Sequence, residues 1–329
     1  QDKKNFITKI CVTAQHREML DKVLDTFDLK PDIDLNIMKT KQSLSKLSSS
    51  IMISLNNIFK IDKPDLLLVH GDTTTSFIAS LTAFYHGINI AHVEAGLRTN
   101  NIYNPYPEEL NRQIISKIAN IHFSPTIENK KNLISEGVIQ KNIKITGNTV
   151  IDSLHWVIKK IDDNKSIKKE ISQEFLKKIN LNLEKNKYIL ITGHRRENFG
   201  TGFLNICNAL KILAKKYKYI HFIYPVHLNP NVQKPVNKIL GNIPNIHLIE
   251  PLKYESFIFL LKNCFFILTD SGGIQEEAPS LGKPVLLMRK TTERPECIAA
   301  GNVILVGTTS RKIVNYSKLL IDDPIFFNS

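Results

Sequence analysis

The chain has 329 residues, of which 42% are hydrophobic and 23% are charged, and its formal net charge is +13. This length predicts two domains, and the composition excludes a largely disordered chain. The positive charge would suit nucleic acid or an anionic membrane, but the lysines are spread over many predicted helix faces without interleaved aromatic residues. We therefore expect neither partner, although the sign of the charge would favour a phosphorylated substrate.

The chain shows no sign of export, of a membrane span or of a metal site. Its four cysteines are far apart and form no CxxC pair, so neither a disulfide framework nor a zinc site is expected. The apolar stretch Phe257–Leu268 is far shorter than the roughly 20 residues that a spanning helix needs. The first residues lack the apolar region of a secretory signal. We expect a cytoplasmic protein.

Short β-branched runs alternate with longer amphipathic segments along the whole chain, which is typical of βαβ units that build a parallel sheet. In the first half we expect strands at Lys9–Val12, Leu66–His70, Ile88–His92, Ile121–Ser124 and Ile143–Thr146, and helices at Leu44–Phe59, Thr75–Tyr85 and Glu108–Ala119. In the second half we expect strands at Tyr188–Thr192, His221–Tyr224, Ile246–Ile249, Phe265–Thr269, Pro284–Leu287 and Val303–Val306. The predicted fold class is α/β, with two Rossmann-like, doubly wound domains in tandem.

A polar segment, Val157–Lys187, separates the two halves and contains no apolar strand. We place the domain boundary near residue 165, which gives domains over 1–164 and 165–329. Both ends of the chain are abrupt, because no strand and glycine turn precede the first predicted strand, and Ile325-Phe326-Phe327 has no visible packing partner. We expect that a first strand and a C-terminal helix are missing.

Acidic side chains follow predicted strands or begin a helix at three places in the first half. The three runs are His70-Gly71-Asp72-Thr73-Thr74-Thr75, His92-Val93-Glu94-Ala95-Gly96-Leu97-Arg98 and Pro105-Tyr106-Pro107-Glu108-Glu109-Leu110-Asn111-Arg112. Ligands of open α/β sheets bind beyond the carboxyl ends of the strands, so we expect Asp72, Glu94 and Glu108 to converge at one edge. Structural roles are the alternatives. Asp72 or a threonine could cap a helix, and Glu94 could pair with Arg98. Glu108 could simply favour the first turn of a helix, and for Glu109 we expect only that role.

The run Thr192-Gly193-His194-Arg195-Arg196-Glu197-Asn198 follows the first predicted strand of the second half. A glycine, an imidazole and two guanidiniums at a strand end suit a diphosphate or a negatively charged leaving group. An imidazole of His194 that faces the core is the alternative, and the neighbouring arginines argue against it.

The run Asp270-Ser271-Gly272-Gly273-Ile274-Gln275-Glu276-Glu277 reads as a strand end, a glycine pair and a helix start. Because Gly272 and Gly273 lack β-carbons, the backbone can approach a phosphate at the helix N-terminus. Glu276 or Glu277, one turn onward, could accept hydrogen bonds from a ribose diol. No GxxxxGK[ST], GxSxG, HExxH or complete GxGxxG motif is present, which argues against kinase, hydrolase and zinc protease functions.

Taken in order, these motifs resemble the non-hydrolysing bacterial UDP-N-acetylglucosamine 2-epimerases over nearly the whole chain. The resemblance rests on Thr13–Leu20, His70–Thr74, His92–Thr99, Thr146–Val150, Gly193–Glu197, Pro225–Pro230, Asp270–Glu277 and Thr291–Glu296. It implies a fold similar to GT-B, with the active site in the interdomain cleft, UDP held mainly by the second domain and the sugar facing the first.

The resemblance also implies an activity. Members interconvert UDP-GlcNAc and UDP-ManNAc by eliminating UDP to give a 2-acetamidoglucal and adding UDP back after the proton returns to the other face of C2. The resemblance implies no cofactor, and it implies a homodimer. UDP-ManNAc would serve the synthesis of surface polysaccharides in bacteria.

The resemblance implies roles for single residues as well. Asp72, Glu94 and Glu108 would form the acid/base and cation-stabilising group, and His194 would assist the departing diphosphate. Substrate-binding residues would be Ser271, Gly272, Gly273, Glu277, Arg195 and Arg294. Gln15, His16 and Arg17 resemble the region where some bacterial members bind a second UDP-GlcNAc as an activator.

One departure from the family pattern leaves alternatives open. The family's first strand is followed by a Gly-Thr-Arg-Pro-Glu turn whose arginine contacts the phosphate region, and the chain starts after it. A GT-B glycosyltransferase that uses UDP-GlcNAc, a truncated nucleotide-sugar-binding protein without activity and a hydrolysing epimerase are the alternatives.

Overall fold

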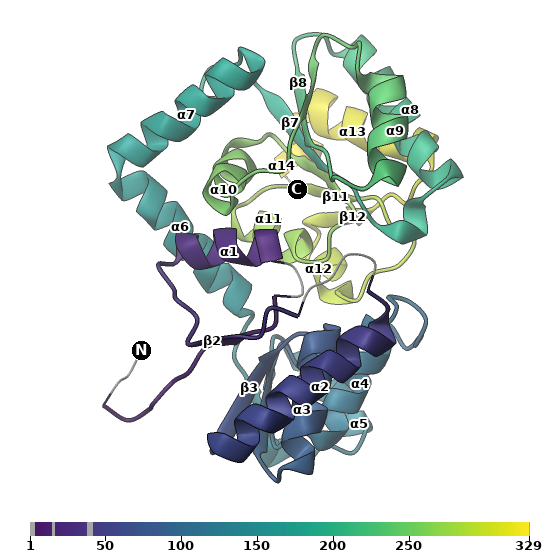
Figure 1. The fold of residues 1–329 in the computed structure, drawn as a ribbon. Coiled ribbons are helices and arrows are strands. Elements are labelled where there is room, and N and C mark those ends of the chain that lie inside the picture. The colour runs from purple at the N-terminus through teal and green to yellow at the C-terminus, as the bar shows by residue number, and fades with distance from the viewer. Residues whose placement is uncertain (1–3, 15–16, 38–41, 329) are drawn as a thin grey trace. The chain divides into compact units, whose positions relative to one another are not determined.

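The computed structural model describes residues 4–14, 17–37 and 42–328. The chain divides into two compact units, Gln1–Thr149 and Val150–Ser329, each with parallel strands and flanking helices, as Figure 1 shows. The α/β fold class expected from the sequence is therefore confirmed. The division lies before the expected boundary near residue 165, which falls at the junction of α6 (Thr149–Asp163) and α7 (Lys165–Ile179).

The first unit contains a four-stranded parallel sheet in the order β3-β4-β5-β6, and β1 pairs with β2 in a separate parallel ladder. Its strands are β1 (Cys11–Val12), β2 (Ile33–Asp34), β3 (Leu66–His70), β4 (Asn89–Val93), β5 (Ile121–Ser124) and β6 (Ile143–Ile145). Its helices are α1 (Arg17–Thr26), α2 (Leu44–Ile61), α3 (Thr74–Tyr85), α4 (Glu108–Ile118), α5 (Ile127–Ser135) and η1 (Gln140–Asn142). The sequential strand order makes consecutive βα connections carry the chain across this sheet.

Helix α2 shows why these segments fold as they do. Leu47, Ile51, Leu55 and Phe59 recur every four residues, so they share one face, and all four are buried. Ser43 caps the helix by accepting a hydrogen bond from the backbone N–H of Lys46. Figure 1 shows α2 beside α3 and α3 beside α4, and this row of helices shares one hydrophobic core with β3 and β4.

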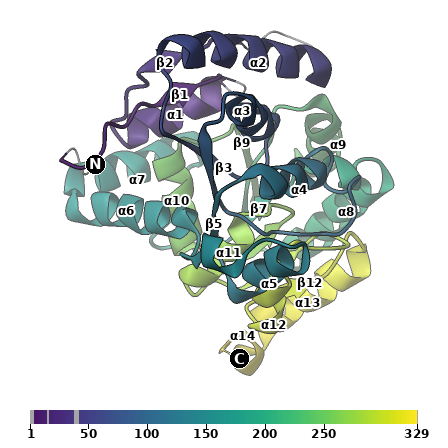
Figure 2. The ribbon, with the colours of Figure 1, turned by 90° about the horizontal axis from the view of Figure 1, so that it is seen from below.

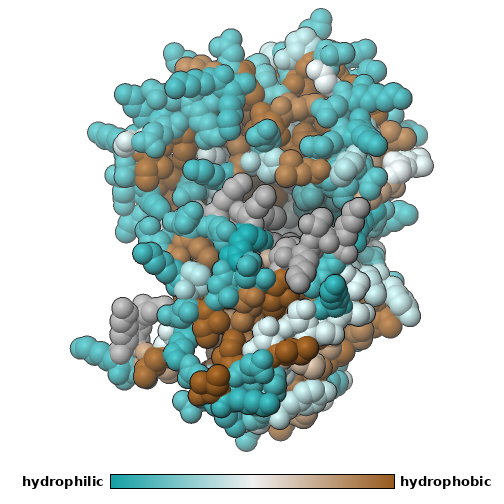
Figure 3. All heavy atoms as spheres, in the orientation of Figure 1, coloured by the Kyte–Doolittle hydropathy of each residue, from teal (hydrophilic) through white to brown (hydrophobic). Residues whose placement is uncertain are grey.

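Strand β3 lies at the edge of the four-stranded sheet, and its Leu66 and Leu68 are exposed. Figure 3 shows apolar atoms at the surface of this unit among polar ones. Among the described residues, we find no helix that is both long and apolar enough to cross a bilayer.

The second unit is built on a six-stranded parallel sheet in the order β9-β8-β7-β10-β11-β12. Its strands are β7 (Tyr188–Thr192), β8 (His221–Pro225), β9 (Ile246–Ile249), β10 (Ile267–Thr269), β11 (Val285–Leu287) and β12 (Val303–Leu305). The order runs outward from β7 in one direction and outward from β10 in the other. Strands β7 and β10 are therefore the topological switch point of a doubly wound sheet, where such folds bind ligands.

The helices of the second unit complete the double winding. They are α6, α7, η2 (Arg196–Asn198), α8 (Thr201–Lys216), α9 (Pro230–Leu240), α10 (Tyr254–Asn263), α11 (Ile274–Ser280), α12 (Pro295–Ala299), α13 (Ser310–Asp322) and α14 (Pro324–Asn328). Helix α8 packs against both α9 and α13, and Figures 1 and 2 show these helices grouped on one side of the unit. Their buried side chains join those of the strands in one hydrophobic core.

The end of the chain packs against this core, contrary to the expectation that its apolar residues have no partner. Phe326 and Phe327 contact the core of the second unit, and the ring of Phe327 stacks on Phe265 with 4.5 Å between centroids. Only Ile325 of the three remains exposed. The expectation failed because a partner ring more than fifty residues earlier in the chain leaves no local signal in the sequence.

Candidate functional site

Glu94 lies directly after β4, at the carboxyl edge of the first sheet. Its backbone adopts a φ of +67°, a conformation that non-glycine residues rarely take and that often marks functional positions. The side chain accepts a hydrogen bond from Asn148 (3.3 Å), and its other oxygen lies 3.6 Å from Nε2 of His70. A β-carbon at Gly71 would stand 3.2 Å from that same oxygen. Glu94 is therefore held at the strand end with 17% of its side chain exposed.

Asp72 follows β3 at the same edge. One carboxylate oxygen accepts a hydrogen bond of 2.6 Å from Arg112, and the backbone carbonyl accepts one of 2.8 Å from Asn111. Asp72 does not cap the following helix, because Thr73 accepts the hydrogen bond from Ser76 there. Of the two structural alternatives considered for this run, the capping threonine is the one observed, and the carboxylate of Asp72 remains available for another role.

The third acid, Glu108, lies on helix α4, which also contacts Asp72. Glu108 is its first residue and is half-buried, and in the described part of the chain its carboxylate makes no hydrogen bond. Glu109 is completely buried and accepts hydrogen bonds from the backbone N–H groups of Thr99 and Asn100, so besides lying in the first turn of the helix it fixes the loop that precedes it. Because Asn111 and Arg112 of the same helix bind Asp72, α4 ties Glu108 and Asp72 to one edge.

The ion pair between Glu94 and Arg98 considered above does not form. Arg98 is buried and instead binds both oxygens of Glu136, at 2.6 and 2.8 Å. A spacing of four residues brings side chains together on a helix, whereas a turn at residues 94–96 and irregular backbone at 97–98 follow the strand here. Glu94 therefore keeps its carboxylate at the sheet edge.

Two buried histidines lie beneath this edge. His92 and His122 are opposite each other on β4 and β5, and each is almost fully buried. Burial lowers the pKa of His92 to about 3, although its hydrogen bond of 2.8 Å with the carbonyl of Gly71 opposes the shift. His92 is thus a neutral donor that fixes the turn between β3 and Asp72.

In the second unit, Asp270 joins the two loops at the switch point. Its fully buried carboxylate accepts hydrogen bonds from the backbone N–H groups of His194 and Arg195 and from the side chain of Asn198, all between 2.9 and 3.1 Å. The loop after β7 is therefore fixed to the end of β10. Sequence reasoning gave Asp270 no separate role, although its position after a strand and before Gly-Gly was visible.

The first glycine of the Gly-Gly pair is enclosed by charged side chains. A β-carbon at Gly272 would stand 2.7 Å from Glu293, 3.0 Å from Arg294 and 3.4 Å from Arg195. The second glycine, Gly273, has only Glu277 nearby, at 4.0 Å. The structure thus brings Gly272, Arg195 and Arg294 together, as expected for one binding site, and it places Ser271 beside them in the same loop.

A buried charge network supports these arginines. Arg294 is ion-paired with Glu276 and Glu293, and Arg289, which is 1% exposed, binds Glu293 and Glu197 at 2.8 Å each. Burial opposes ionisation of Glu293, but Arg294 and Arg289 outweigh it and lower its pKa to about 2. The sequence gave no sign of this network, since Glu197 lies in η2, Glu276 in α11, and the other three members in the loop after β11.

Glu277 is buried on α11, and its environment differs from that of Glu293. Burial and the neighbouring Glu276 raise its pKa to about 7, against the opposing effects of a hydrogen bond with Tyr254 and the charge of Arg294. The carboxyl group therefore changes protonation near neutral pH, and it lies one turn from Gly273, where a ribose was expected.

His194 stands at the mouth of the same loop. Its ring stacks on His227, with 5.3 Å between centroids, and lies 3.7 Å from Asp270. Burial lowers the pKa of His194, Arg195 and His227 lower it further, and Asp270 opposes them. His194 does not face the hydrophobic core, because 41% of its side chain is exposed. It is a partly exposed imidazole on the same loop as Arg195.

The expected activator region is described only in part. Gln15 and His16 lie outside the described residues. Arg17 binds Asp34 with two hydrogen bonds (2.6 and 3.0 Å) and Asn36 with one (2.9 Å). Its guanidinium is thus engaged by the chain itself, and it stays a prediction that this region binds a nucleotide-sugar.

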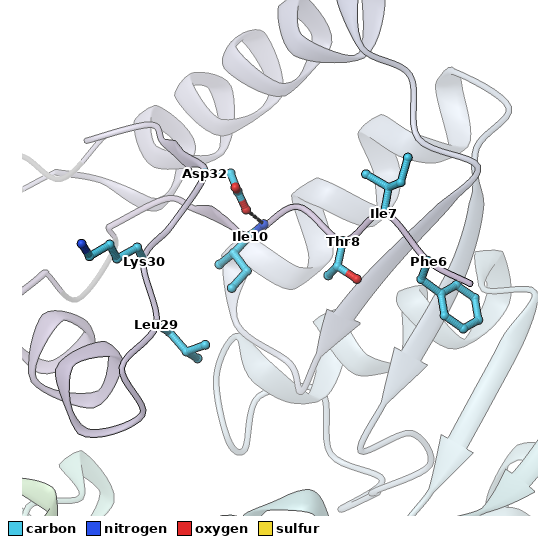
Figure 4. A pocket seen from close by; sticks show the side chains of 7 residues that line it. All are labelled: Phe6, Ile7, Thr8, Ile10, Leu29, Lys30 and Asp32. Carbon is cyan, nitrogen blue, oxygen red and sulfur yellow. Dashed lines mark hydrogen bonds between the residues drawn. The ribbon is translucent and has the colours of Figure 1, made fainter. Parts of the chain in front are cut away.

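A pocket of about 500 Å³ opens near the N-terminal segment, as Figure 4 shows. It is lined by Phe6, Ile7, Thr8, Ile10, Leu29, Lys30 and Asp32. None of these is a candidate site residue, and both Phe6 and Ile7 are exposed. We assign no function to this pocket. Over the described ranges, no group of three or more metal-binding side chains occurs.

The comparisons with known proteins agree with the motifs. A family model described as UDP-N-acetylglucosamine 2-epimerase matches residues 1–326. A protein of that name from Campylobacter jejuni is 56% identical over 315 residues, which are 96% of this chain and 82% of the relative. The one from Yersinia pestis is 51% identical over 98% of this chain and 85% of the relative.

Solved structures give the same answer. The UDP-GlcNAc 2-epimerase of Neisseria meningitidis, solved bound to UDP-GlcNAc, is 51% identical with a TM-score of 0.94, over 98% of this chain and 86% of the other. The Methanocaldococcus jannaschii enzyme, solved with UDP-GlcNAc and UDP, is 31% identical with a TM-score of 0.84, over 97% and 86%. The resemblance drawn from the motifs is confirmed: the chain belongs to the UDP-N-acetylglucosamine 2-epimerase family, whose members are isomerases.

Proposed function

We propose that this protein interconverts UDP-GlcNAc and UDP-ManNAc by inverting the configuration at C2 of the sugar. The observation that carries the proposal is the edge of the first sheet, where Glu94 is held in a strained conformation and Asp72 is fixed by α4. A weakly acidic C2–H needs a carboxylate in a fixed position to remove the proton and another acid to return it to the opposite face. Family membership and the solved complexes of relatives with UDP-GlcNAc support the choice of substrate.

In the proposed reaction, a carboxylate takes the proton from C2 and the C1–O bond to UDP breaks. The electrons of the C2–H bond form the C1–C2 double bond of 2-acetamidoglucal, and those of the C1–O bond leave with UDP. A second acid then delivers a proton to the other face of C2 while UDP adds back to C1. Asp72, Glu94 and Glu108 form the acid/base and cation-stabilising group. No electron acceptor is needed, because the addition of UDP reverses its elimination.

The second unit supplies the binding of UDP in this proposal. Arg195 and Arg294 neutralise the diphosphate, and the loop of Ser271, Gly272 and Gly273 lets the backbone approach it. Glu277 binds the ribose hydroxyls. His194, half-exposed beside Arg195, assists the departing diphosphate.

Three wider proposals rest on the family alone. We expect the protein to act in the cytoplasm and as a homodimer, and we expect UDP-ManNAc to serve the synthesis of surface polysaccharide. A glycosyltransferase would also bind UDP-GlcNAc, but it has no need of three acids on one sheet edge, and a protein that only binds would not need Glu94 in a strained conformation.

Proton NMR of the protein with UDP-GlcNAc in heavy water tests the function. We expect deuterium at C2 together with the anomeric signal of UDP-ManNAc. Accumulation of free ManNAc and UDP would show a hydrolysing epimerase instead, and transfer of GlcNAc to an added acceptor would show a glycosyltransferase. Binding of UDP without exchange at C2 would contradict the proposal in favour of a protein that only binds.

A further inference from the structure

A chain of three charged side chains leads from the interior of the first unit to Asp72. Glu109 is completely buried, Arg112 has 4% of its side chain exposed, and Asp72 has 23%. Nη1 of Arg112 lies 3.3 Å from Glu109, and Nη2 lies 2.6 Å from Asp72. Only the last member of this chain reaches the surface, at the edge where the candidate acids lie.

The innermost member is rigidly held. Glu109 accepts hydrogen bonds from the backbone N–H groups of Thr99 and Asn100 and from the side chain of Gln113, all between 3.0 and 3.1 Å. With both oxygens engaged, a buried carboxylate cannot rotate without losing several of these bonds. Glu109 therefore fixes the position of the guanidinium that lies against it.

In the described part of the chain, the side chain of Arg112 donates one hydrogen bond, and Asp72 accepts it. Within the described residues, Nε and Nη1 of Arg112 are buried and form no hydrogen bond, and only Nη2 does. Arg98, the other buried arginine of this unit, binds both oxygens of Glu136, Ser116 and the carbonyl of Leu97 with all three of its nitrogens. A purely structural arginine is expected to resemble Arg98, because unpaired buried donors are costly.

Asp72 accepts two hydrogen bonds from one turn of helix α4. Asn111 binds its backbone carbonyl and Arg112 binds Oδ2, whereas Oδ1 makes no hydrogen bond in the described part of the chain. Helix α4, which begins at Glu108, thus sets the place of Asp72 relative to another candidate acid. One oxygen of Asp72 is held, and the other is left for a ligand.

We propose that Arg112, itself held by Glu109, is a positioning residue for proton transfer at C2: it binds Oδ2 of Asp72 and so aims Oδ1 at the substrate. This inference rests on the proposed function, since it gives Asp72 a proton to transfer. It extends the site to two buried residues for which sequence reasoning gave no part in the reaction.

The test compares Arg112→Ala with Arg98→Ala, which removes a buried arginine and its ion pair from the same unit without touching Asp72. Exchange of the C2 proton of UDP-GlcNAc in heavy water is followed for both variants and the wild type, with ethylguanidinium added in a second series. We expect kcat of Arg112→Ala to fall about 100-fold with little change in KM, and ethylguanidinium to restore part of it. Arg98→Ala should keep kcat within a few-fold and show no rescue.

A second variant covers the case in which Arg112→Ala does not fold. Arg112→Lys keeps the charge and most of the volume but cannot hold Glu109 and Asp72 with one planar group. It should fold with a lower kcat and an unchanged KM. Equal losses for the Arg112 and Arg98 variants, a loss confined to KM, or full activity of Arg112→Lys would overturn the inference. If the wild type itself shows no exchange, the proposed function fails and the inference fails with it.

Discussion

The buried carboxylate of Asp270 accepts the backbone N–H of His194, at 3.0 and 3.1 Å from its two oxygens, across the switch point of the second sheet. The two residues are 76 positions apart, and the bond joins the loop of β7 to the end of β10. The loop that presents His194 and Arg195 is therefore set by a residue that need not touch the substrate itself.

Replacing this carboxylate tests its role. In Asp270→Asn, the new NH₂ group must face N–H donors, so some of the bonds to His194, Arg195 and Asn198 are lost. We expect the free energy of unfolding to fall by about 1–3 kcal/mol and the affinity for UDP to fall about tenfold, since tenfold corresponds to about 1.4 kcal/mol. Urea denaturation and calorimetric titration with UDP measure the two effects.

Asp322→Asn is the matched control for that experiment. Asp322 also accepts a side-chain hydrogen bond in the second unit, from Tyr217 at 2.6 Å, but it is 50% exposed. We expect its replacement to change stability by less than about 1 kcal/mol. Equal effects of the two substitutions would show that the burial of Asp270 is unimportant.

The two adjacent glycines should respond differently to alanine. In Gly272→Ala the new methyl group meets Glu293 at 2.7 Å and Arg294 at 3.0 Å, so the charged side chains must move. We expect a loss of about 1–3 kcal/mol in stability. In Gly273→Ala the nearest atom is 4.0 Å away and φ is −63°, so stability should change little. Thermal unfolding of both variants measures the two changes in stability, and a larger loss of stability for Gly273→Ala would contradict the packing described.

Glu277 predicts a dependence of stability on pH. Its pKa is about 7 in the folded protein and about 4.5 when unfolded, so the folded state holds a proton that the unfolded state releases between these values. Its contribution to stability is complete below pH 4.5 and is lost as the pH rises to 7, by about 3 kcal/mol in total. Urea denaturation at pH 5 and pH 7 should show this slope in the wild type and not in Glu277→Gln. The same slope in both proteins would assign it to another group.

Asp72→Asn separates chemistry from binding. We expect the variant to bind UDP as the wild type does, because Asp72 lies in the first unit and the arginines proposed for UDP lie in the second. Exchange of the C2 proton should fall by about 100-fold or more, since the amide cannot accept a proton. Calorimetry and proton NMR in heavy water check the two statements. A variant that loses UDP binding as well would make Asp72 a structural residue.

Much of the fold could be predicted because strands and helices are local patterns. β3, β5, β7 and β9 have the residue limits that alternation and flanking turns predicted. The run after β3 could be predicted to be a site because strand ends of parallel sheets are where ligands bind, and that stays a prediction.

What could not be predicted are contacts between residues distant in the chain. The partner of Asp72 is 40 residues away, and the partner of Arg98 is 38 residues away, although Glu94 is only four. Spacing identifies neighbours only inside a helix or strand, and these side chains lie on loops or on different elements. The polar segment expected to separate the domains contains part of α6 and all of α7.

Because His92 is neutral, it does not contribute to the dependence of the C2 exchange rate on pH. With a pKa of about 3, the imidazole ring of His92 stays neutral from mildly acidic to alkaline solution, so its hydrogen bond to the carbonyl of Gly71 persists throughout. The hydrogen bond that fixes the turn before Asp72 therefore does not depend on pH in this range. Titration of His92 is therefore not the cause of any change in the exchange rate between pH 5 and 8.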